Sequence, residues 1–461
     1  MSLIEQALIS AIKKLPKTPI VIAYSGGVDS QVLLHALATL SHNQVIVNPI
    51  TVCHVNHGLS NNAHSWQSFA EQQCAKHNLP LVIKQVTINI QTQQSLEALA
   101  RDARYQALSS IYQESSLIIT GHHSDDQSET FLLALKRGAG LKGLSAMALD
   151  STLAHHQLLR PFLSISRQKI EEYASEHQLN WIEDESNTDT SFDRNFLRQD
   201  IMPLLTSRWP SIQNTINRSA QHCREGQQLL DELAEDDLLR CQETTTSLNV
   251  SLLTELSLAR FNNLIRYFLA KSGCLMPSTE QLIQVRQQLF ASSDKTPEIK
   301  VADHYLRRFK GQLYVTDVLE DVSAWQRELS SLSALVHEQN ISEQLVLPDH
   351  IGMLCFDIIE GIEVSTSQNK TLQQLALPNA KQKVTIKFSH QNPRCLPHYR
   401  QHSRPLKKVL QELEIPPWQR TRVPFLYYGE KLVAAIGYFV CQGYVAKKNE
   451  KCLQVLIKKT L

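Results

Sequence analysis

The chain has 461 residues, too many for one compact core, so we expect two or three domains. Hydrophobic residues make up 42% and charged residues 20%, as in soluble globular proteins, and no apolar run is long enough to cross a membrane. The nine cysteines include no C-x-x-C pair, which argues against a disulfide framework or a zinc knuckle and fits a reducing cytoplasm.

The net charge of +1 conceals two oppositely charged parts. Residues 381–461 hold 16 basic and four acidic residues, a charge of +12, so the first 380 residues carry −11. A basic C-terminal module predicts a polyanionic partner, and the alternative is a merely solvated basic face.

Residues 1 to about 200 alternate apolar strands with helical patterns, after an amphipathic N-terminal helix. We expect strands at 20–23, 49–55, 81–86, 117–120 and 158–163. We expect helices after residue 30 and at 63–77, 95–112 and 124–136. This alternation predicts an α/β fold, a doubly wound parallel sheet whose ligands bind at the carboxyl ends of its strands.

The rest of the chain is organised around the first strand and the turn that follows it. The strand runs into Ser25-Gly26-Gly27-Val28-Asp29-Ser30, and a helix follows. The glycines allow a sharp turn, the free N–H groups and serine hydroxyls suit a phosphate, and Asp29 suits Mg²⁺. No Lys follows the glycines, so this is not a G-x-x-x-x-G-K-[ST] loop. The hexapeptide resembles the PP-loop of ATP pyrophosphatases, which cleave ATP between the α- and β-phosphates.

Polar motifs also follow the second and third strands. The segment His54-Val55-Asn56-His57-Gly58 contains either metal ligands or hydrogen-bonded loop residues. We favour the second interpretation, because no Cys or carboxylate lies at ligand spacing. On the next helix, Arg101 and Arg104 share a face, and Glu97 lies four residues before Arg101. Taken alone, these charges would indicate a surface salt bridge.

Carboxylates gather where the fourth strand meets its helix. Asp126 and Glu129 share a helical face, with Asp125 nearby and His122 and His123 just before them. Carboxylates in a first turn often serve only the helix dipole. Beside a phosphate-binding turn, they indicate a site for Mg²⁺ or for a substrate ammonium group. The charged segment 181–198 is either a solvated loop or a loop folded over the active site.

Taken together and in this order, these segments resemble tRNA(Ile)-lysidine synthetases. The shared motifs are SGGVDS, H-x-N-H-G, E-x-x-A-R-x-x-R-Y, G-H-H-x-D-D-Q-x-E-T, R-G-x-G-x-x-G-L at 137–144, and W-x-E-D-x-S-N with R-N-x-x-R. The match covers roughly the first 200 residues tightly. It departs at Ser60, where the family commonly has Arg, and this weakens any role for that position.

The resemblance implies four parts. They are a PP-loop ATP pyrophosphatase catalytic domain (1–215), a mainly helical substrate- and tRNA-binding domain (216–320), a connector (321–380) and a small, basic α+β C-terminal tRNA-binding domain (381–461). An apolar-periodic helix at 252–270 fits the second part. A strand at 383–388, a basic helix at 404–410 and a rigid turn at 415–424 fit the last.

The resemblance also implies a reaction. ATP adenylates O2 of the wobble cytidine, position 34, of the isoleucine tRNA with a CAU anticodon, and pyrophosphate leaves. The amine of free L-lysine then attacks C2 and expels AMP, forming lysidine and changing the codon read from AUG to AUA. The implied small-molecule requirements are ATP, Mg²⁺ and L-lysine.

The same resemblance assigns roles to residues. ATP would be held by Ser25, Gly26, Gly27, Val28, Asp29, Ser30 and His54. Lysine would be bound by His122, Asp126 and Glu129, and Mg²⁺ by Asp29. The expected catalytic side chains are Asp29, Arg101, Arg104 and Asp126, with the choice between the two arginines open. The expected tRNA contacts are Arg194, Arg198, Lys407, Lys408, Arg420 and Arg422, while Trp418 either stacks on RNA or packs.

Three rival functions deserve comparison. A tRNA thiolase with the same loop would carry sulfur on cysteines, but only Cys53 and Cys74 lie in the nucleotide domain, and neither is in a motif. A zinc cytidine deaminase would need an H-x-E…P-C-x-x-C signature, which is absent. A non-enzymatic tRNA-binding protein would explain the basic module but not SGGVDS. The sequence fixes neither the tRNA identity elements nor the oligomeric state.

Overall fold

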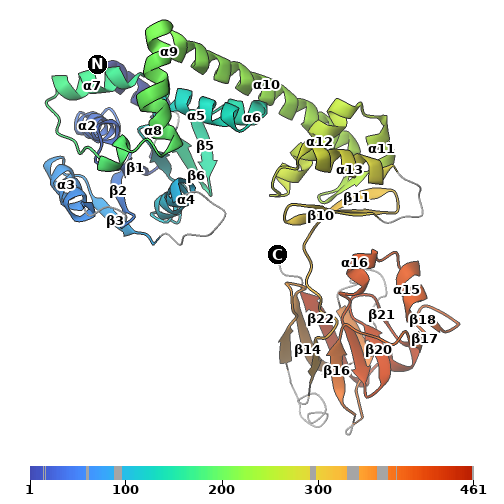
Figure 1. The fold of residues 1–461 in the computed structure, drawn as a ribbon. Coiled ribbons are helices and arrows are strands. Elements are labelled where there is room, and N and C mark those ends of the chain that lie inside the picture. Colours follow the sequence, from blue (N-terminus) through green and yellow to red (C-terminus); the bar gives the residue numbers. More distant parts are fainter. Residues whose placement is uncertain are drawn as a thin grey trace. The chain divides into compact units, whose positions relative to one another are not determined.

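The computed structural model describes residues 1–13, 15, 17–58, 62–87, 96–290, 297–329, 342–360, 372–379 and 382–458. Ser60 and the side chain of Glu97 lie outside the described residues. The chain divides into two compact units, Met1–Leu233 and Ala234–Leu461 (Figure 1). No helix in the described ranges combines the length and apolar character needed to cross a bilayer.

A six-stranded sheet with the order β3-β2-β1-β4-β6-β5 forms the centre of the first unit (Figure 1). Neighbouring strands are parallel, except that the edge strand β5 is antiparallel to β6. The strands are β1 (Ile20–Tyr24), β2 (Ile50–Asn56), β3 (Leu81–Gln85), β4 (Leu117–Ile119), β5 (Asp150–Leu153) and β6 (His156–Leu159). The predicted parallel α/β sheet is therefore confirmed.

Helices surround this sheet and continue past it. They are α1 (Leu3–Ile12), α2 (Val28–His42), α3 (Ala63–Lys76), α4 (Leu96–Ser109), α5 (Ser124–Lys136), α6 (Leu141–Leu144), α7 (Arg167–Glu176), α8 (Asp193–Phe196) and α9 (Met202–Arg208). A 3-10 turn covers Glu185–Thr188 and a π-helical turn covers Leu197–Ile201. The long helix α10 (Ile212–Cys241) runs beyond the end of the first unit.

Alternate residues of β1 enter two different cores, as expected for a sheet covered on both faces. Ile20 and Ile22 pack into the larger core, with side chains from α1, α2 and α7. Val21 packs on the other face, with Leu108 of α4. This burial on both sides explains the uninterrupted apolar run of the strand, and it leaves only the strand ends for polar chemistry.

The second unit begins with three helices that share a core with an antiparallel sheet of order β7-β8-β11-β10-β9. The elements are β7 (Gln242–Thr244), β8 (Ser247–Asn249), α11 (Val250–Glu255), α12 (Leu258–Lys271), α13 (Thr279–Leu289), β9 (Glu298–Val301), β10 (His304–Phe309) and β11 (Gln312–Asp317). The single helix expected over 252–270 is two helices, because Ser257 caps α12 by accepting a hydrogen bond from N of Arg260 (3.3 Å). This sheet was not predicted from the sequence.

The remainder of the unit holds two antiparallel sheets, β12-β16-β19-β20-β21 and β13-β14-β22-β15, which share one core. Their strands are β12 (Gln326–Glu328), β13 (Ser342–Val346), β14 (Met353–Glu360), β15 (Leu372–Ala376), β16 (Val384–Lys387), β19 (Phe425–Tyr428), β20 (Lys431–Ala435), β21 (Phe439–Val440) and β22 (Lys451–Lys458). A two-stranded pair, β17 (Arg394–Cys395) and β18 (Arg404–Pro405), accompanies α15 (Leu406–Glu412), α16 (Pro417–Arg420) and a 3-10 turn at Gln442–Tyr444.

The expected connector at 321–380 instead contributes strands to these sheets. β12 pairs with β16, and β14 pairs with β22 along its whole length. The partners lie far along the chain, so no local sequence pattern reveals the pairing. The basic C-terminal domain therefore includes structure that precedes residue 381.

Candidate active site

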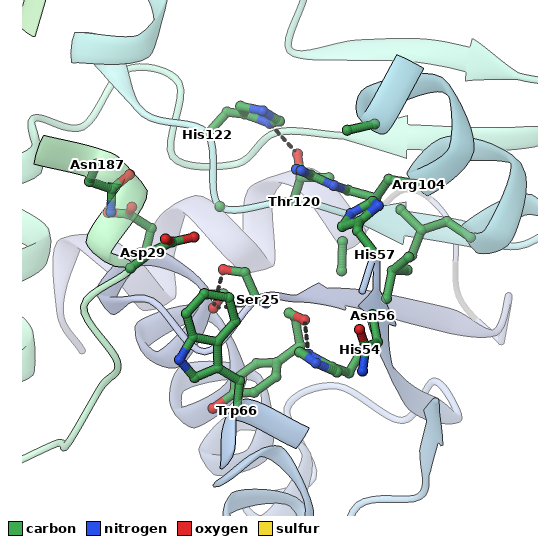
Figure 2. Close-up of a pocket in the computed structure, with 18 of the residues that line it drawn as sticks. Ser25, Asp29, His54, Asn56, His57, Trp66, Arg104, Thr120, His122 and Asn187 are labelled. Atoms are coloured by element: carbon green, nitrogen blue, oxygen red, sulfur yellow. Dashed lines mark hydrogen bonds between the residues drawn. The ribbon is translucent and has the colours of Figure 1, made fainter. Parts of the chain in front are cut away.

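A cavity of about 690 Å³ opens at the carboxyl ends of β1, β2 and β4 (Figure 2). Its walls include Ser25 after β1, His54 near the end of β2 and Thr120 after β4. Side chains from α3, α4, α5 and the segment 184–198 complete it. This is the edge at which a parallel sheet binds its ligands, and the volume suits a nucleotide together with a smaller molecule.

The turn between β1 and α2 is held in shape by Ser30. Its hydroxyl oxygen accepts hydrogen bonds from N of Gly26 (3.0 Å) and N of Ser25 (3.3 Å), and it donates to the carbonyl of Gly27 (2.9 Å). Gly26 has φ +90°, and a Cβ there would lie 2.9 Å from Cδ1 of Ile182. Gly27 caps α2 with no side-chain hydrogen bond. The first N–H groups of α2, which begins at the buried Val28, are thus left for an anion.

Asp29 points an unsatisfied oxygen into this region. Among the described residues, buried Oδ1 has no hydrogen-bond donor, and Nε2 of His123 is 3.6 Å away. Burial raises the pKa of Asp29, and His123 opposes that shift. Such an oxygen fits Mg²⁺, which prefers carboxylate, phosphate and water oxygens. Within the described ranges, no group of three or more His, Cys, Asp or Glu side chains could hold a metal ion.

The histidines of the second motif are neutral and hydrogen bonded or buried. Nδ1 of His54 lies 3.1 Å from the carbonyl oxygen of Tyr24, which can only accept, so Nδ1 carries the proton. Burial lowers the pKa of His54. Burial, with the charge of Arg104, lowers the pKa of His57 to about 4. The expected hydrogen-bonded loop residues are therefore found only in part: His54 is hydrogen bonded but lies within β2, and the buried Nδ1 of His57 has no hydrogen-bond partner among the described residues.

The two arginines of α4 are placed differently. Arg104 lines the cavity and lies close to His57 in Figure 2. Arg101 is not among the residues that line it, and its guanidinium lies 5.3 Å from the ring centroid of Tyr105. The geometry therefore favours Arg104 as the arginine that reaches a substrate.

His123 fixes the start of α5. Its Nδ1 accepts a hydrogen bond from N of Asp125 (3.3 Å), and Asp126 Oδ2 accepts one from N of His123 (3.1 Å). Burial alone would lower the pKa of His123, but Asp125, Asp126 and Asp29 raise it above its usual value. Asp125 Oδ2 also accepts from N of Arg167 (2.9 Å), so Asp125 joins α5 to α7. Asp125 is thus structural.

Asp126 and His122 face the cavity. Burial would raise the pKa of Asp126, but His123 and Arg194 outweigh burial and lower it, so this side chain is a carboxylate at neutral pH. Burial lowers the pKa of His122 to about 3, with Asp126 opposing, so its ring is neutral. Nδ1 of His122 is 2.8 Å from Oγ1 of Thr120, as Figure 2 shows.

Glu129 lies behind two arginines. Its side chain is 2% exposed and is not part of the cavity lining. Nε and Nη2 of Arg198 donate to its two carboxylate oxygens at 2.7 and 2.9 Å, and Nε of Arg194 is 3.1 Å from Oε2. Arg194 and Arg198, expected to contact tRNA, line the cavity. Glu129, expected to bind lysine, is shielded from it.

Sequence reasoning missed the aromatic walls of the cavity. Trp66 of α3, Tyr105 of α4 and Phe192 all line it. In Figure 2, Trp66 and His122 lie at opposite sides of the cavity. Tyr105 was at least part of a motif, whereas Trp66 and Phe192 lie among residues with no pattern of their own, so only the tertiary structure identifies them.

The basic residues of the C-terminal domain also divide into two groups. Lys407 and Lys408 are exposed on α15. Arg420 donates from Nε to the carbonyl of Ile415 (2.7 Å). Arg422 is ion-paired with Asp349 and mostly buried. The two lysines are therefore available to a phosphate, while the two arginines already stabilise the domain.

Trp418 packs against protein. Its ring lies 5.4 Å from that of Tyr314 and 6.1 Å from that of Phe309, edge to face in both cases. The guanidinium of Arg307 is 5.6 Å from its centroid. Of the two roles considered for Trp418, packing is the one the structure supports.

Comparison with known proteins identifies the family. Three family descriptions match: "PP-loop domain" over residues 1–205, "TilS substrate binding domain" over 248–314 and "TilS substrate C-terminal domain" over 384–457. The tRNA(Ile)-lysidine synthase of Serratia proteamaculans (strain 568) is 42% identical over 425 residues, which are 92% of each chain. That of Coxiella burnetii (strain RSA 493 / Nine Mile phase I) is 37% identical over 430 residues, 93% of this chain and 91% of the relative.

Among solved structures, the U34-tRNA thiolase NcsA from Methanococcus maripaludis matches 48% of this chain and 78% of its own, at 16% identity and a TM-score of 0.41. That similarity is too weak to bear on function. The relatives cover nearly the whole chain at about 40% identity, and residues from all of the shared motifs except the one at 137–144 line one cavity. The chain therefore belongs to the tRNA(Ile)-lysidine synthase family.

Proposed function

We propose that this chain forms lysidine at C2 of the wobble cytidine of the CAU-anticodon isoleucine tRNA, using ATP and free L-lysine held in the cavity. The proposal follows the activity for which the family is named. One observation carries it: the preformed phosphate-binding turn and the ionised Asp126 face the same cavity of about 690 Å³. A phosphate site and a cation site side by side suit a reaction that joins an activated base to an amine.

In the first step, the ATP phosphates lie on the turn at 25–30, held by the first N–H groups of α2 and by Ser25. The cytosine O2 attacks the α-phosphorus, and the bond to the β-phosphate oxygen breaks. Asp29 would hold the Mg²⁺, which would supply positive charge for the leaving pyrophosphate. Arg104 stabilises the charge that develops on the α-phosphate, as preorganised cations do in such sites.

In the second step, the amine of lysine attacks C2 of the adenylated cytosine. The new C2–N bond forms, the C2–O bond breaks and the oxygen leaves with AMP, while the amine releases a proton. Asp126 is ionised and holds an ammonium group of lysine. His122 is neutral, so it does not repel that ammonium, and its hydrogen bond to Thr120 fixes its ring.

The target base has to leave the anticodon stack to reach the cavity. Enzymes that modify bases place the extruded base between aromatic side chains. Trp66 and Phe192 supply such walls here. Lys407 and Lys408, in the basic C-terminal domain, contact tRNA phosphates. The three substrates are cytoplasmic, and so is the proposed location.

The test uses an isoleucine tRNA transcript with a CAU anticodon, ATP, Mg²⁺ and labelled L-lysine. We expect label in the tRNA and release of pyrophosphate and AMP in equal amounts, and no label when the wobble cytidine is replaced by uridine. Incorporation of sulfur, or pyrophosphate release that needs neither lysine nor tRNA, would contradict the proposal. Removal of Mg²⁺ with a chelator should stop the first step, measured as the release of pyrophosphate. This result tests the metal requirement separately from tRNA binding.

A further inference from the structure

One guanidinium of the cavity wall is held in place from behind. Arg198 donates from Nε and Nη2 to Glu129 at 2.7 and 2.9 Å, and from Nη2 to Asp126 Oδ1 at 3.2 Å. Glu129 is 2% exposed, whereas the side chain of Arg198 is 30% exposed and lines the cavity. A bidentate pair of this kind fixes both the position and the plane of the guanidinium.

The fixed guanidinium keeps one nitrogen for a ligand. No hydrogen bond of Arg198 Nη1 occurs within the described residues. Arg194 also contacts Glu129, with Nε 3.1 Å from Oε2. The two arginines thus face two buried carboxylates, Glu129 and Asp126, and what Arg198 keeps for a ligand is its Nη1. An anionic group in the cavity would find a positioned donor at Arg198, and the ionised Asp126 lies beside it.

The local backbone places Arg198 there. It lies in the π-helical turn Leu197–Ile201, and such turns reorient side chains and are frequent at functional sites. The same segment is tied to α5 a second time, because Nζ of Lys136 contacts Asp193 at 2.7 Å on the exposed surface. The Lys136–Asp193 pair joins α5 to the segment that carries Arg198, but neither of its residues lines the cavity. A change at Lys136 is therefore a matched control for changes at Arg198 and Glu129.

Free lysine carries an α-carboxylate as well as two ammonium groups. Burying that carboxylate in a cavity without a partner would be costly, so a site that selects an amino acid must supply a cation for it. We infer that Glu129 is a positioning residue that presents Arg198 to the α-carboxylate of lysine, and that Glu129 does not bind lysine itself. The inference rests on the proposed function. It assigns Arg198, which was expected from the sequence to contact tRNA, to the recognition of lysine.

The experiment compares L-lysine with L-lysinamide, which keeps both amines and lacks the carboxylate. Wild-type protein must first show lysine-dependent release of AMP; without that, the proposed function itself fails. Loss of a charge-assisted hydrogen bond corresponds to roughly a 10- to 100-fold change. Arg198→Gln should raise the KM for lysine by that factor and leave the KM for lysinamide within about threefold, so the preference for lysine disappears.

Glu129→Gln should give the same pattern, and the double variant should be no worse than Arg198→Gln alone. Glu129→Asp keeps the carboxylate but shortens the side chain by one methylene. It should therefore raise the KM for lysine less than Glu129→Gln does. It also keeps the test valid if Glu129→Gln does not fold. Lys136→Gln should leave both KM values unchanged. Thermal unfolding of every variant separates a misplaced Arg198 from a damaged fold.

Three outcomes would overturn the inference. If Glu129→Gln raises the KM for lysinamide as much as that for lysine, Glu129 binds an ammonium group directly. If Arg198→Gln raises the KM for ATP and leaves that for lysine unchanged, the anion held by Arg198 is a phosphate. The inference is also overturned if the effects of the two single changes on the KM for lysine multiply in the double variant. A positioning residue has no effect once the residue it positions is gone.

Discussion

Replacement of Gly26 by alanine tests whether the shape of the phosphate-binding turn matters. Gly26 has φ +90°, a region that costs an L-residue about 1–2 kcal/mol. The added Cβ would also lie 2.9 Å from Cδ1 of Ile182, but that atom is the end of a flexible side chain and can shift at little cost. The backbone conformation therefore sets the free-energy cost of the substitution. That cost corresponds to a factor of roughly 5 to 30 in an equilibrium constant.

The cost of the alanine conformation should change either the free energy of unfolding or the KM for ATP. If the turn keeps its conformation, Gly26→Ala lowers the free energy of unfolding by about 1–2 kcal/mol, measured by urea denaturation. If the turn relaxes, stability is kept and the KM for ATP rises by roughly 5- to 30-fold. The control is Gly226→Ala within α10, where a Cβ would make an ordinary 3.6 Å contact with Leu141. That change should stabilise by about 0.5–1 kcal/mol. A Gly26→Ala variant with wild-type stability and wild-type KM would refute the reasoning.

Three further predictions follow from the site and its surroundings. Arg104→Gln should lower kcat by roughly 100- to 1,000-fold in the lysine-dependent assay, and Arg101→Gln should not, since only Arg104 lines the cavity; equal losses would contradict this. Lys407→Glu with Lys408→Glu should weaken tRNA binding and reduce the slope of log affinity against log salt by roughly one per lost phosphate contact, with the KM for ATP unchanged. His35, packed against Tyr173 and His177, has its pKa lowered to about 4 by burial and by neighbouring His177 and His77. The unfolded chain therefore takes up a proton first, so wild-type stability should fall between pH 6.5 and pH 4, and His35→Asn should show a shallower fall.

The sequence predicted the first unit well because its strands are buried on both faces. The expected strand at 20–23 became Ile20–Tyr24, and the helix expected at 124–136 became Ser124–Lys136. Runs such as these carry their own signal, since every residue meets apolar neighbours. The position of the cavity followed from the same argument, because the ends of parallel strands are the places left for polar groups.

What the sequence could not predict depends on contacts between distant residues. Arg194 and Arg198 belong to a charged segment that resembles a solvated surface, and only their partner Glu129 places them in the wall of the cavity. The short strand β12 shows little pattern by itself, and both β12 and the eight-residue β14 pair with strands much later in the chain. Arg422 was likewise expected to meet RNA, and Asp349 is the nearby partner that the sequence does not reveal.

The position of β22 has a consequence for how the protein is made. This strand lies between β14 and β15, and its residue Gln454 pairs with Asp357 on one side and Gln374 on the other. While the chain is being synthesised, β14 and β15 emerge long before the strand that joins them. Until β22 is made, the edges of β14 and β15 that pair with it stay exposed to solvent. Exposed strand edges favour association with other chains. The first unit ends at Leu233 and can fold early, so the C-terminal sheet is the part of the protein whose folding waits for late translation.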